Sequence, residues 1–197
     1  MSKKETAVTE PKTASTVNID PKFVTKLTGI LLGICAVVAL LLGVVNAVTE
    51  PIITQMQAEK TAAAMSMVLK AEDYEKVDAS FDNVVAIYEA ISGGKQLGYV
   101  VEVTTNGFGG AINMVVGVDM NDAVTGVSVT KNAETKNIGT KVVGDQSVLD
   151  RFIGKSGTLT VNTGANRFDG ISGATVTSKA VTAGVNTALA AVAALKG

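Results

Sequence analysis

One apolar run near the start of the chain constrains its fold more than any other feature. Residues Leu27 to Val48 contain no charged side chain. About 22 residues at roughly 1.5 Å each give a helix of about 33 Å, enough to cross a hydrocarbon layer of about 30 Å. A buried helix of a soluble protein is normally shorter, and the apolar part of a cleaved signal peptide usually has about 7 to 15 residues. We therefore expect a membrane-spanning helix.

The charges on either side of this run predict its orientation. The segment after it opens with Glu50, whereas lysines gather before it. These are Lys3, Lys4, Lys12, Lys22 and Lys26. Because positive charge favours the cytoplasmic side, we expect a single-pass protein of the cell (inner) membrane with a cytoplasmic N-terminus and an extracytoplasmic C-terminal domain.

The composition excludes several classes of chemistry. The chain has no His and one Cys, so by itself it cannot form a Ser-His-Asp triad, a Cys-His pair, a disulfide or a zinc site of the common Cys/His types. Its net charge of −1 gives no electrostatic footprint for nucleic acid. We therefore expect no nucleic-acid partner, no metal site and no catalytic residue of these classes. Any chemistry would come from a cofactor or rest on carboxylates, hydroxyls and lysines.

Composition shifts divide the chain into four parts. Residues 1–26 resemble a solvated cytoplasmic tail, and 27–48 form the expected span. Residues 49–82 are rich in Ala, Met, Gln, Glu and Lys, which favour a helical connector. Residues 83–197 form the expected extracytoplasmic domain.

The pattern within this domain predicts an α+β fold. From Val84, short β-branched runs alternate with Gly, Asn and Asp, which is typical of an antiparallel meander, here of about four strands. Ser147 is placed to cap a short helix, and apolar residues spaced by three and four predict a closing helix from about Thr177 to Leu195. We expect an antiparallel sheet flanked by helices, packed on one face of it.

The most informative segment runs from Asp169 to Thr175, with the sequence Asp-Gly-Ile-Ser-Gly-Ala-Thr, just before the closing helix. Small residues and hydroxyls at a helix entrance suit a phosphate group, because the first N–H groups and the helix dipole favour an anion. The same residues would also suit an ordinary Ser or Thr cap. Asp169 could orient the hydroxyl of Thr175 or serve as a turn residue.

The run resembles the D-x-x-[ST]-G-A-[TS] flavinylation motif of FMN-binding domains. This family includes the G subunit of the Rnf ion-translocating ferredoxin:NAD+ oxidoreductase complex and the C subunit of the Na+-translocating NADH:quinone oxidoreductase. The resemblance implies FMN joined covalently by a phosphoester bond to Thr175. It also implies a separate flavin transferase that uses Mg2+ and takes FAD as donor.

Further segments extend the resemblance over nearly the whole chain from about residue 25. Residues 107–112 are similar to the family's glycine-rich turn, and 134–139 to its E-T-P-G-L-G loop, with Lys136-Asn137 in place of Pro-Gly. By this resemblance Thr135 would hydrogen-bond the flavin ring and Ile138 would lie against its face. The implied cofactor-binding residues are Thr175, Ser172, Gly173, Ala174, Asp169, Thr135, Ile138, Glu134 and Gly109.

The resemblance implies an electron-transfer subunit, not a complete enzyme. Its partners would be the other membrane and peripheral subunits of the Rnf complex. Two alternatives stay open. One is an FMN-carrying subunit of another extracytoplasmic electron-transfer chain, such as the quinone-reducing complex, and the other is a non-redox, membrane-anchored binding or assembly protein.

Overall fold

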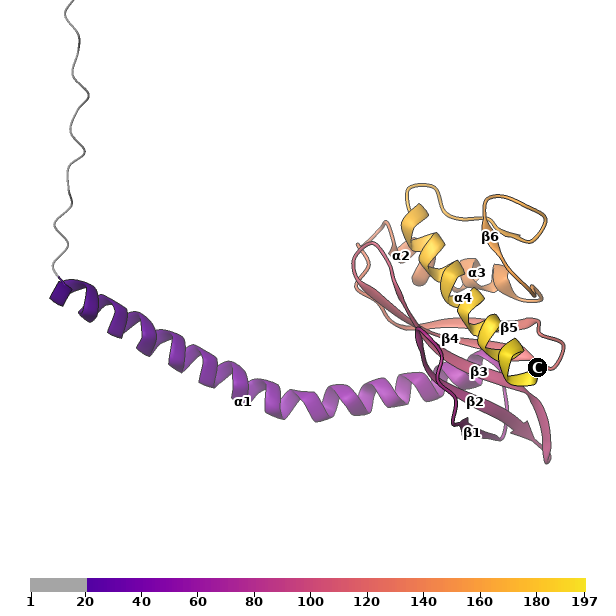
Figure 1. Ribbon diagram of the computed structural model, residues 1–197, viewed down its shortest axis with the longest axis horizontal. Coiled ribbons are helices and arrows are strands. Elements are labelled where there is room, and N and C mark those ends of the chain that lie inside the picture. The colour runs from indigo at the N-terminus through magenta and orange to yellow at the C-terminus, as the bar shows by residue number, and fades with distance from the viewer. Residues whose placement is uncertain (1–20) are drawn as a thin grey trace, which may run out of the picture. The chain divides into compact units, whose positions relative to one another are not determined.

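The computed structural model describes residues 21–197 and divides between Ile52 and Ile53 into two compact units (Figure 1). Residues 1–20 of the predicted tail lie outside the described residues. Helix α1 (Pro21–Val68) belongs to the first unit up to Ile52, and its last residues belong to the second.

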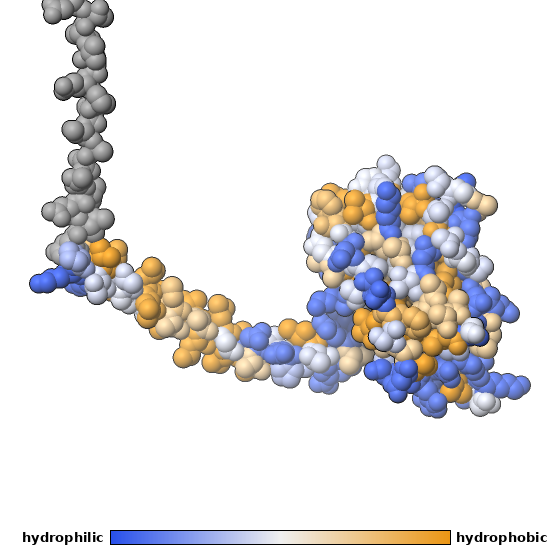
Figure 2. Space-filling model, in the orientation of Figure 1, coloured by the Kyte–Doolittle hydropathy of each residue, from blue (hydrophilic) through white to orange (hydrophobic). Residues whose placement is uncertain are grey.

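In the first unit, α1 exposes every side chain from Pro21 to Ile52. Figure 2 shows apolar residues along this stretch. Two helices of the described residues are long and apolar enough to cross a membrane, α1 and the closing helix α4 (Thr175–Lys196). The most apolar 18-residue stretch of α1 has no buried residue, whereas 56% of the corresponding stretch of α4 is buried. We infer that α4 is a core helix and that α1 suits a membrane anchor.

The second unit is built on a five-stranded antiparallel sheet in which each strand pairs with the next in the chain. The strands are β1 (Asp73–Val77), β2 (Val84–Ser92), β3 (Lys95–Asn106), β4 (Ala111–Asp119) and β5 (Val124–Lys131). The prediction of about four strands missed β1, which lies inside the segment 49–82 expected as a helical connector. This edge strand has three charged residues among five and no β-branched run. Short connections make sequential strands neighbours, as expected.

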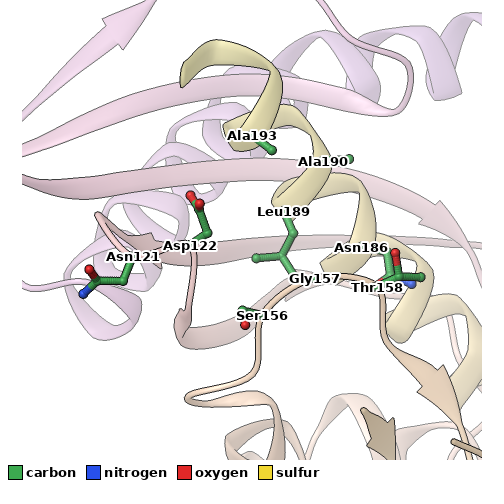
Figure 3. Close-up of a pocket in the computed structure, with 9 residues that line it drawn as sticks. All are labelled: Asn121, Asp122, Ser156, Gly157, Thr158, Asn186, Leu189, Ala190 and Ala193. Carbon is green, nitrogen blue, oxygen red and sulfur yellow. The ribbon is translucent and has the colours of Figure 1, made fainter. Parts of the chain in front are cut away.

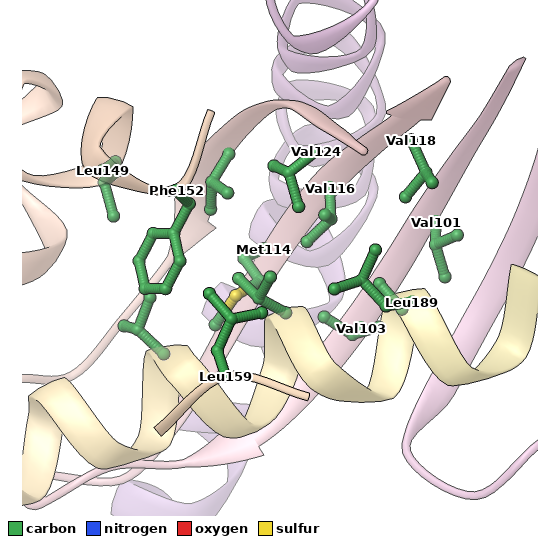
Figure 4. Packing of buried hydrophobic residues seen from close by; sticks show 14 of the residues in the cluster. Val101, Val103, Met114, Val116, Val118, Val124, Leu149, Phe152, Leu159 and Leu189 are labelled. Atoms are coloured by element: carbon green, nitrogen blue, oxygen red, sulfur yellow. The ribbon is translucent and has the colours of Figure 1, made fainter. Parts of the chain in front are cut away.

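Helix α4 covers one face of the sheet (Figures 1 and 4). Val181, Val185 and Val192 on the helix are fully buried, as are Val101 and Val116 on the strands below. Burying an apolar side chain of this size stabilises a fold by roughly 1.5–3 kcal/mol. The three- and four-residue spacing on α4 therefore produces the main hydrophobic core.

The opposite face of the sheet is covered by the end of α1, so the expectation of helices on one face only was wrong. Met65 and Val68 pack there against Val100 and Val115. Thr125 on β5 also donates a hydrogen bond of 2.6 Å from Oγ1 to the carbonyl of Val68. The physical reason is visible in the central strands, which carry continuous apolar runs, because strands buried on both faces do not alternate.

Short elements connect the sheet to α4. They are α2 (Thr140–Val143), α3 (Gln146–Leu149), the 3-10 helix η1 (Asp150–Phe152) and the paired strands β6 (Thr160–Val161) and β7 (Arg167–Phe168). Asp145, not the predicted Ser147, caps α3, since its carboxylate accepts from the Ser147 N–H at 3.0 Å. The rings of Phe152 and Phe168 stack with centroids 4.2 Å apart and hold η1 against β7.

Candidate functional site

The predicted attachment segment forms a tight turn that leads directly into α4. The N–H of Ala174 donates to the carbonyl of Ile171 at 3.0 Å, and Gly173 has a φ of +82°. This is the pattern of a type II turn, in which the third position favours glycine. The Ile171 N–H donates to the Ser178 hydroxyl at 3.2 Å, which fastens the turn to the helix. Thr175 is the first residue of α4 and its side chain is exposed.

No side chain of the motif caps this helix. The N-cap position belongs to Ala174, which has no side-chain acceptor, and the structure shows no side-chain hydrogen bond at this cap. Ser172 and Thr175 are both exposed. The alternative in which a motif hydroxyl serves only as the helix cap is therefore wrong, and the first-turn N–H groups remain directed out of the helix start.

Two arginines donate hydrogen bonds to Asp169. Its carboxylate accepts from Nε of Arg167 at 2.9 Å, and its backbone carbonyl accepts from the Arg151 guanidinium at 3.1 Å. The side chain thus points to Arg167, and the chain turns at 172–173, after Asp169. Both predicted roles of Asp169 stay predictions.

A buried carboxylate lies beneath the start of α4. Glu134 is 9% exposed, and its Oε2 accepts from the Thr177 hydroxyl at 2.7 Å. Its Oε1 accepts from the backbone N–H of Gly109 at 3.1 Å. One carboxylate thus joins the glycine-rich turn, the loop that follows β5, and the first turn of α4.

Glycines allow these segments to converge. A Cβ added to Gly107 or Gly139 would collide with the carboxylate of Glu134, and one added to Gly109 would collide with the carbonyl of Ala133. Any larger residue at these positions would force backbone or carboxylate to move. The glycines of the two predicted flavin segments are therefore explained by close approach to Glu134 and its neighbour.

Residues 135–138 form a compact turn with exposed side chains. The Thr135 carbonyl accepts from the N–H groups of Ile138 at 3.2 Å and Thr140 at 3.4 Å. Asn137 occupies the position of Gly in the family's E-T-P-G-L-G loop, and its φ is +64°. Asn is one of the few residues that tolerate this conformation, so the substitution preserves the turn. The side chains of Thr135 and Ile138 point to solvent.

Three exposed apolar side chains belong to the segments that meet at Glu134. Phe108 is 71% exposed, Ile138 48% and Val176 51%. Each is next in the chain to a residue that lies against the Glu134 carboxylate. Phe108 lies between Gly107 and Gly109, Ile138 precedes Gly139, and Val176 precedes Thr177. The structure thus brings the Thr175 hydroxyl, the uncapped start of α4 and apolar side chains from three segments to one end of the domain.

Sequence reasoning selected Glu134 and Gly109 but missed Thr177, Phe108 and Val176. The signal for Thr177 was a hydroxyl at a helix position that the apolar spacing assigns to the buried face. Such a polar group needs a buried partner, and Glu134 is that partner.

A cavity lies elsewhere, beside the second half of α4 (Figure 3). It has a volume of about 460 Å³ and is lined by Asn121, Asp122, Ser156, Gly157, Thr158, Asn186, Leu189, Ala190 and Ala193. None of these is a predicted site residue. Asn186 follows Thr175 by roughly 16 Å along the helix axis at about 1.5 Å per residue.

A family model described as an FMN-binding domain matches residues 107–190. That range begins at the glycine-rich turn and includes Glu134, the turn before α4 and Thr175.

Two curated relatives match over more of the chain. The G subunit of the Na(+)-translocating ferredoxin:NAD(+) oxidoreductase complex of Acetobacterium woodii is 34% identical over 138 residues, which are 62% of this chain and 67% of the relative. The G subunit of the ion-translocating oxidoreductase complex of Methanosarcina acetivorans is 33% identical over 123 residues, 58% of this chain and 65% of the relative.

A solved structure shares the fold. The crystal structure of the C subunit of the Na(+)-translocating NADH-quinone reductase from Parabacteroides distasonis matches with a TM-score of 0.56 and 18% identity, covering 74% of this chain and 96% of that one. Together with the identity and coverage of the Acetobacterium woodii relative, the matched FMN-binding domain shows that this chain belongs to the family of G subunits of ion-translocating oxidoreductase complexes.

Proposed function

We propose that this chain is an electron-transfer subunit that carries FMN on Thr175 through a phosphoester bond, within a membrane-bound ion-translocating ferredoxin:NAD+ oxidoreductase complex of the Rnf type. One observation carries the proposal. The exposed Thr175 hydroxyl stands at an uncapped helix start, inside the flavinylation motif and inside the range matched by the FMN-binding family.

The residues present suit the cofactor. A phosphate ester on Thr175 would lie at the N-terminus of the 22-residue helix α4, where free N–H groups and the helix dipole favour negative charge. Phe108, Ile138 and Val176 offer apolar surface for a flavin ring. When bound, FMN supplies the redox chemistry, and this chain supplies its position and surroundings.

The attachment step requires a second enzyme. The Thr175 oxygen would form the bond to the FMN phosphorus while the pyrophosphate bond of FAD breaks and AMP leaves. A threonine hydroxyl is a weak nucleophile without a base, and this chain contains no His. The proton therefore goes to a base of the flavin transferase, which acts with Mg2+.

We also propose the placement of the chain in the cell membrane. The first part of α1 is apolar and exposed, which supports a single span, and the lysines before it favour a cytoplasmic N-terminus. The domain that carries Thr175 then lies on the extracytoplasmic side. A covalent bond suits that compartment, where a lost cofactor is seldom replaced. The partners are the other membrane and peripheral subunits of the complex.

The test is in-gel fluorescence of the denatured full chain after co-expression with a flavin transferase. The wild type is compared with Thr175→Ala and with Thr187→Ala, a matched loss of a hydroxyl further along α4 that bonds only to its own helix. We expect a fluorescent band for the wild type and Thr187→Ala, and none for Thr175→Ala. A dark wild-type band, with the transferase active on a control protein, would instead favour the membrane-anchored binding protein.

A further inference from the structure

The carboxylate of Glu134 is hydrogen-bonded within the protein itself. Both of its oxygens accept hydrogen bonds, one from Gly109 on the turn before β4 and one from Thr177 on α4. It is buried, and within residues 21–197 it takes part in no ion pair. A buried carboxylate without a countercharge destabilises a fold unless hydrogen bonds satisfy it, and these two bonds meet that need.

The bond to Thr177 acts on the same helical turn as Thr175. Two residues differ by about 200° around a helix, so the two hydroxyls point to nearly opposite sides. Accordingly Thr177 is 1% exposed and Thr175 is exposed. Glu134 therefore holds the inner side of the turn whose outer side presents the attachment hydroxyl.

We propose that Glu134 is a positioning residue: through Thr177 it fixes the first turn of α4 against the turn at 107–110, so that Thr175 and the apolar surface around Phe108 keep one mutual arrangement. This inference rests on the proposed function. It assigns Glu134 a role through its protein contacts, whereas the family resemblance counted it among residues that bind the cofactor. It also adds Thr177, which the resemblance did not indicate.

The experiment compares two buried threonines of α4 in the full chain. Thr177→Val removes the hydroxyl that reaches Glu134. Thr182→Val is the matched control, because Thr182 is also buried but its hydroxyl bonds only to the carbonyl of Ser178 in its own helix. Thr177→Ser keeps the hydroxyl and serves as the rescue variant.

Two quantities are measured for each variant. The first is the initial rate of flavin transfer onto Thr175, followed by in-gel fluorescence. The second is amide hydrogen exchange of the 107–110 turn in the chain without flavin, read by mass spectrometry in detergent. We expect Thr177→Val to slow the transfer about tenfold and to speed exchange at Gly109 about tenfold, since it loses one hydrogen bond to a charged group. Thr177→Ser restores both, and Thr182→Val changes neither by more than about twofold.

The outcomes separate this inference from the proposed function. A wild type that acquires no flavin on Thr175 overturns the proposed function and this role with it. A wild type and a Thr177→Val variant that are labelled equally fast overturn only the positioning role. Equal slowing in Thr182→Val overturns it too, because loss of any buried hydroxyl on α4 would then suffice.

Discussion

The stacked pair Phe152 and Phe168 gives the sharpest test of how the attachment segment is held. Both rings are fully buried and lie nearly parallel, 7° apart, with centroids at 4.2 Å. Phe168 directly precedes Asp169, the first residue of the motif. Phe168→Ala should therefore destabilise the domain and release the segment that leads to Thr175.

The magnitude follows from burial. Removing a buried phenylalanine ring costs about 3–5 kcal/mol, and the stacked geometry places this site toward the upper end. For a domain of this size each kcal/mol lowers Tm by about 2–4 °C, so we expect a loss of about 6–20 °C. The matched control is Phe108→Ala, whose ring is 71% exposed and whose loss should change stability by less than about 0.5 kcal/mol.

The assay is thermal unfolding of the full chain in detergent, followed by circular dichroism. A Phe168→Ala variant that melts within about 2 °C of the wild type would refute the reasoning. So would equal losses for the two variants, because the difference in burial would then have no thermodynamic consequence.

Two further predictions concern the face of the sheet that α1 covers. Burial raises the pKa of Glu102 above its ordinary value of 4.5, and burial together with the charge of Glu102 raises the pKa of Tyr88. The folded state thus binds the Glu102 proton more tightly than the unfolded chain does. This proton binding stabilises the fold below about pH 4.5, and the stabilisation is lost as pH rises through the raised pKa. Glu102→Gln should therefore raise Tm at pH 7 more than at pH 4, and a gap that does not change with pH would contradict the burial argument. Gly126→Ala places a Cβ 2.8 Å from Cα of Val68, so overpacking should cost about 1–3 kcal/mol and loosen the end of α1. Thermal unfolding and hydrogen exchange over residues 64–68 measure this, and an unchanged Tm with unchanged exchange would count against it.

Local patterns predicted much of this fold. The alternation of β-branched runs with turn residues gave four of the five strands, and the apolar spacing gave α4 to within two residues of its start. Strand β1 escaped because an edge strand rich in charged residues has no period-two apolar signal. Asp145 was not predicted as the cap because Asp145 and Ser147 are both suitable residue types two positions apart. The observed hydrogen bond assigns the cap to Asp145.

Contacts between distant segments could not be predicted in this way. Glu134 and Thr177 are 43 residues apart, and their bond depends on how the loop after β5 meets α4. The cover on the second face of the sheet likewise comes from residues 64–68, which local propensity identifies only as helix. The motif at 169–175 predicted Thr175 just before the closing helix, and the structure makes it the first residue of α4. The exposure of Phe108 and Val176 emerged only from the folded arrangement.

The central claim, FMN on Thr175, is tested most directly by mass spectrometry of one tryptic peptide. Cleavage after Arg167 and Lys179 releases residues 168–179, which contain the complete motif and Thr177. In protein matured with an active flavin transferase, we predict that this peptide gains the mass of FMN less one water, and that fragmentation places the added group on Thr175. An unmodified peptide, or a group on Ser172, Thr177 or Ser178, would contradict the claim.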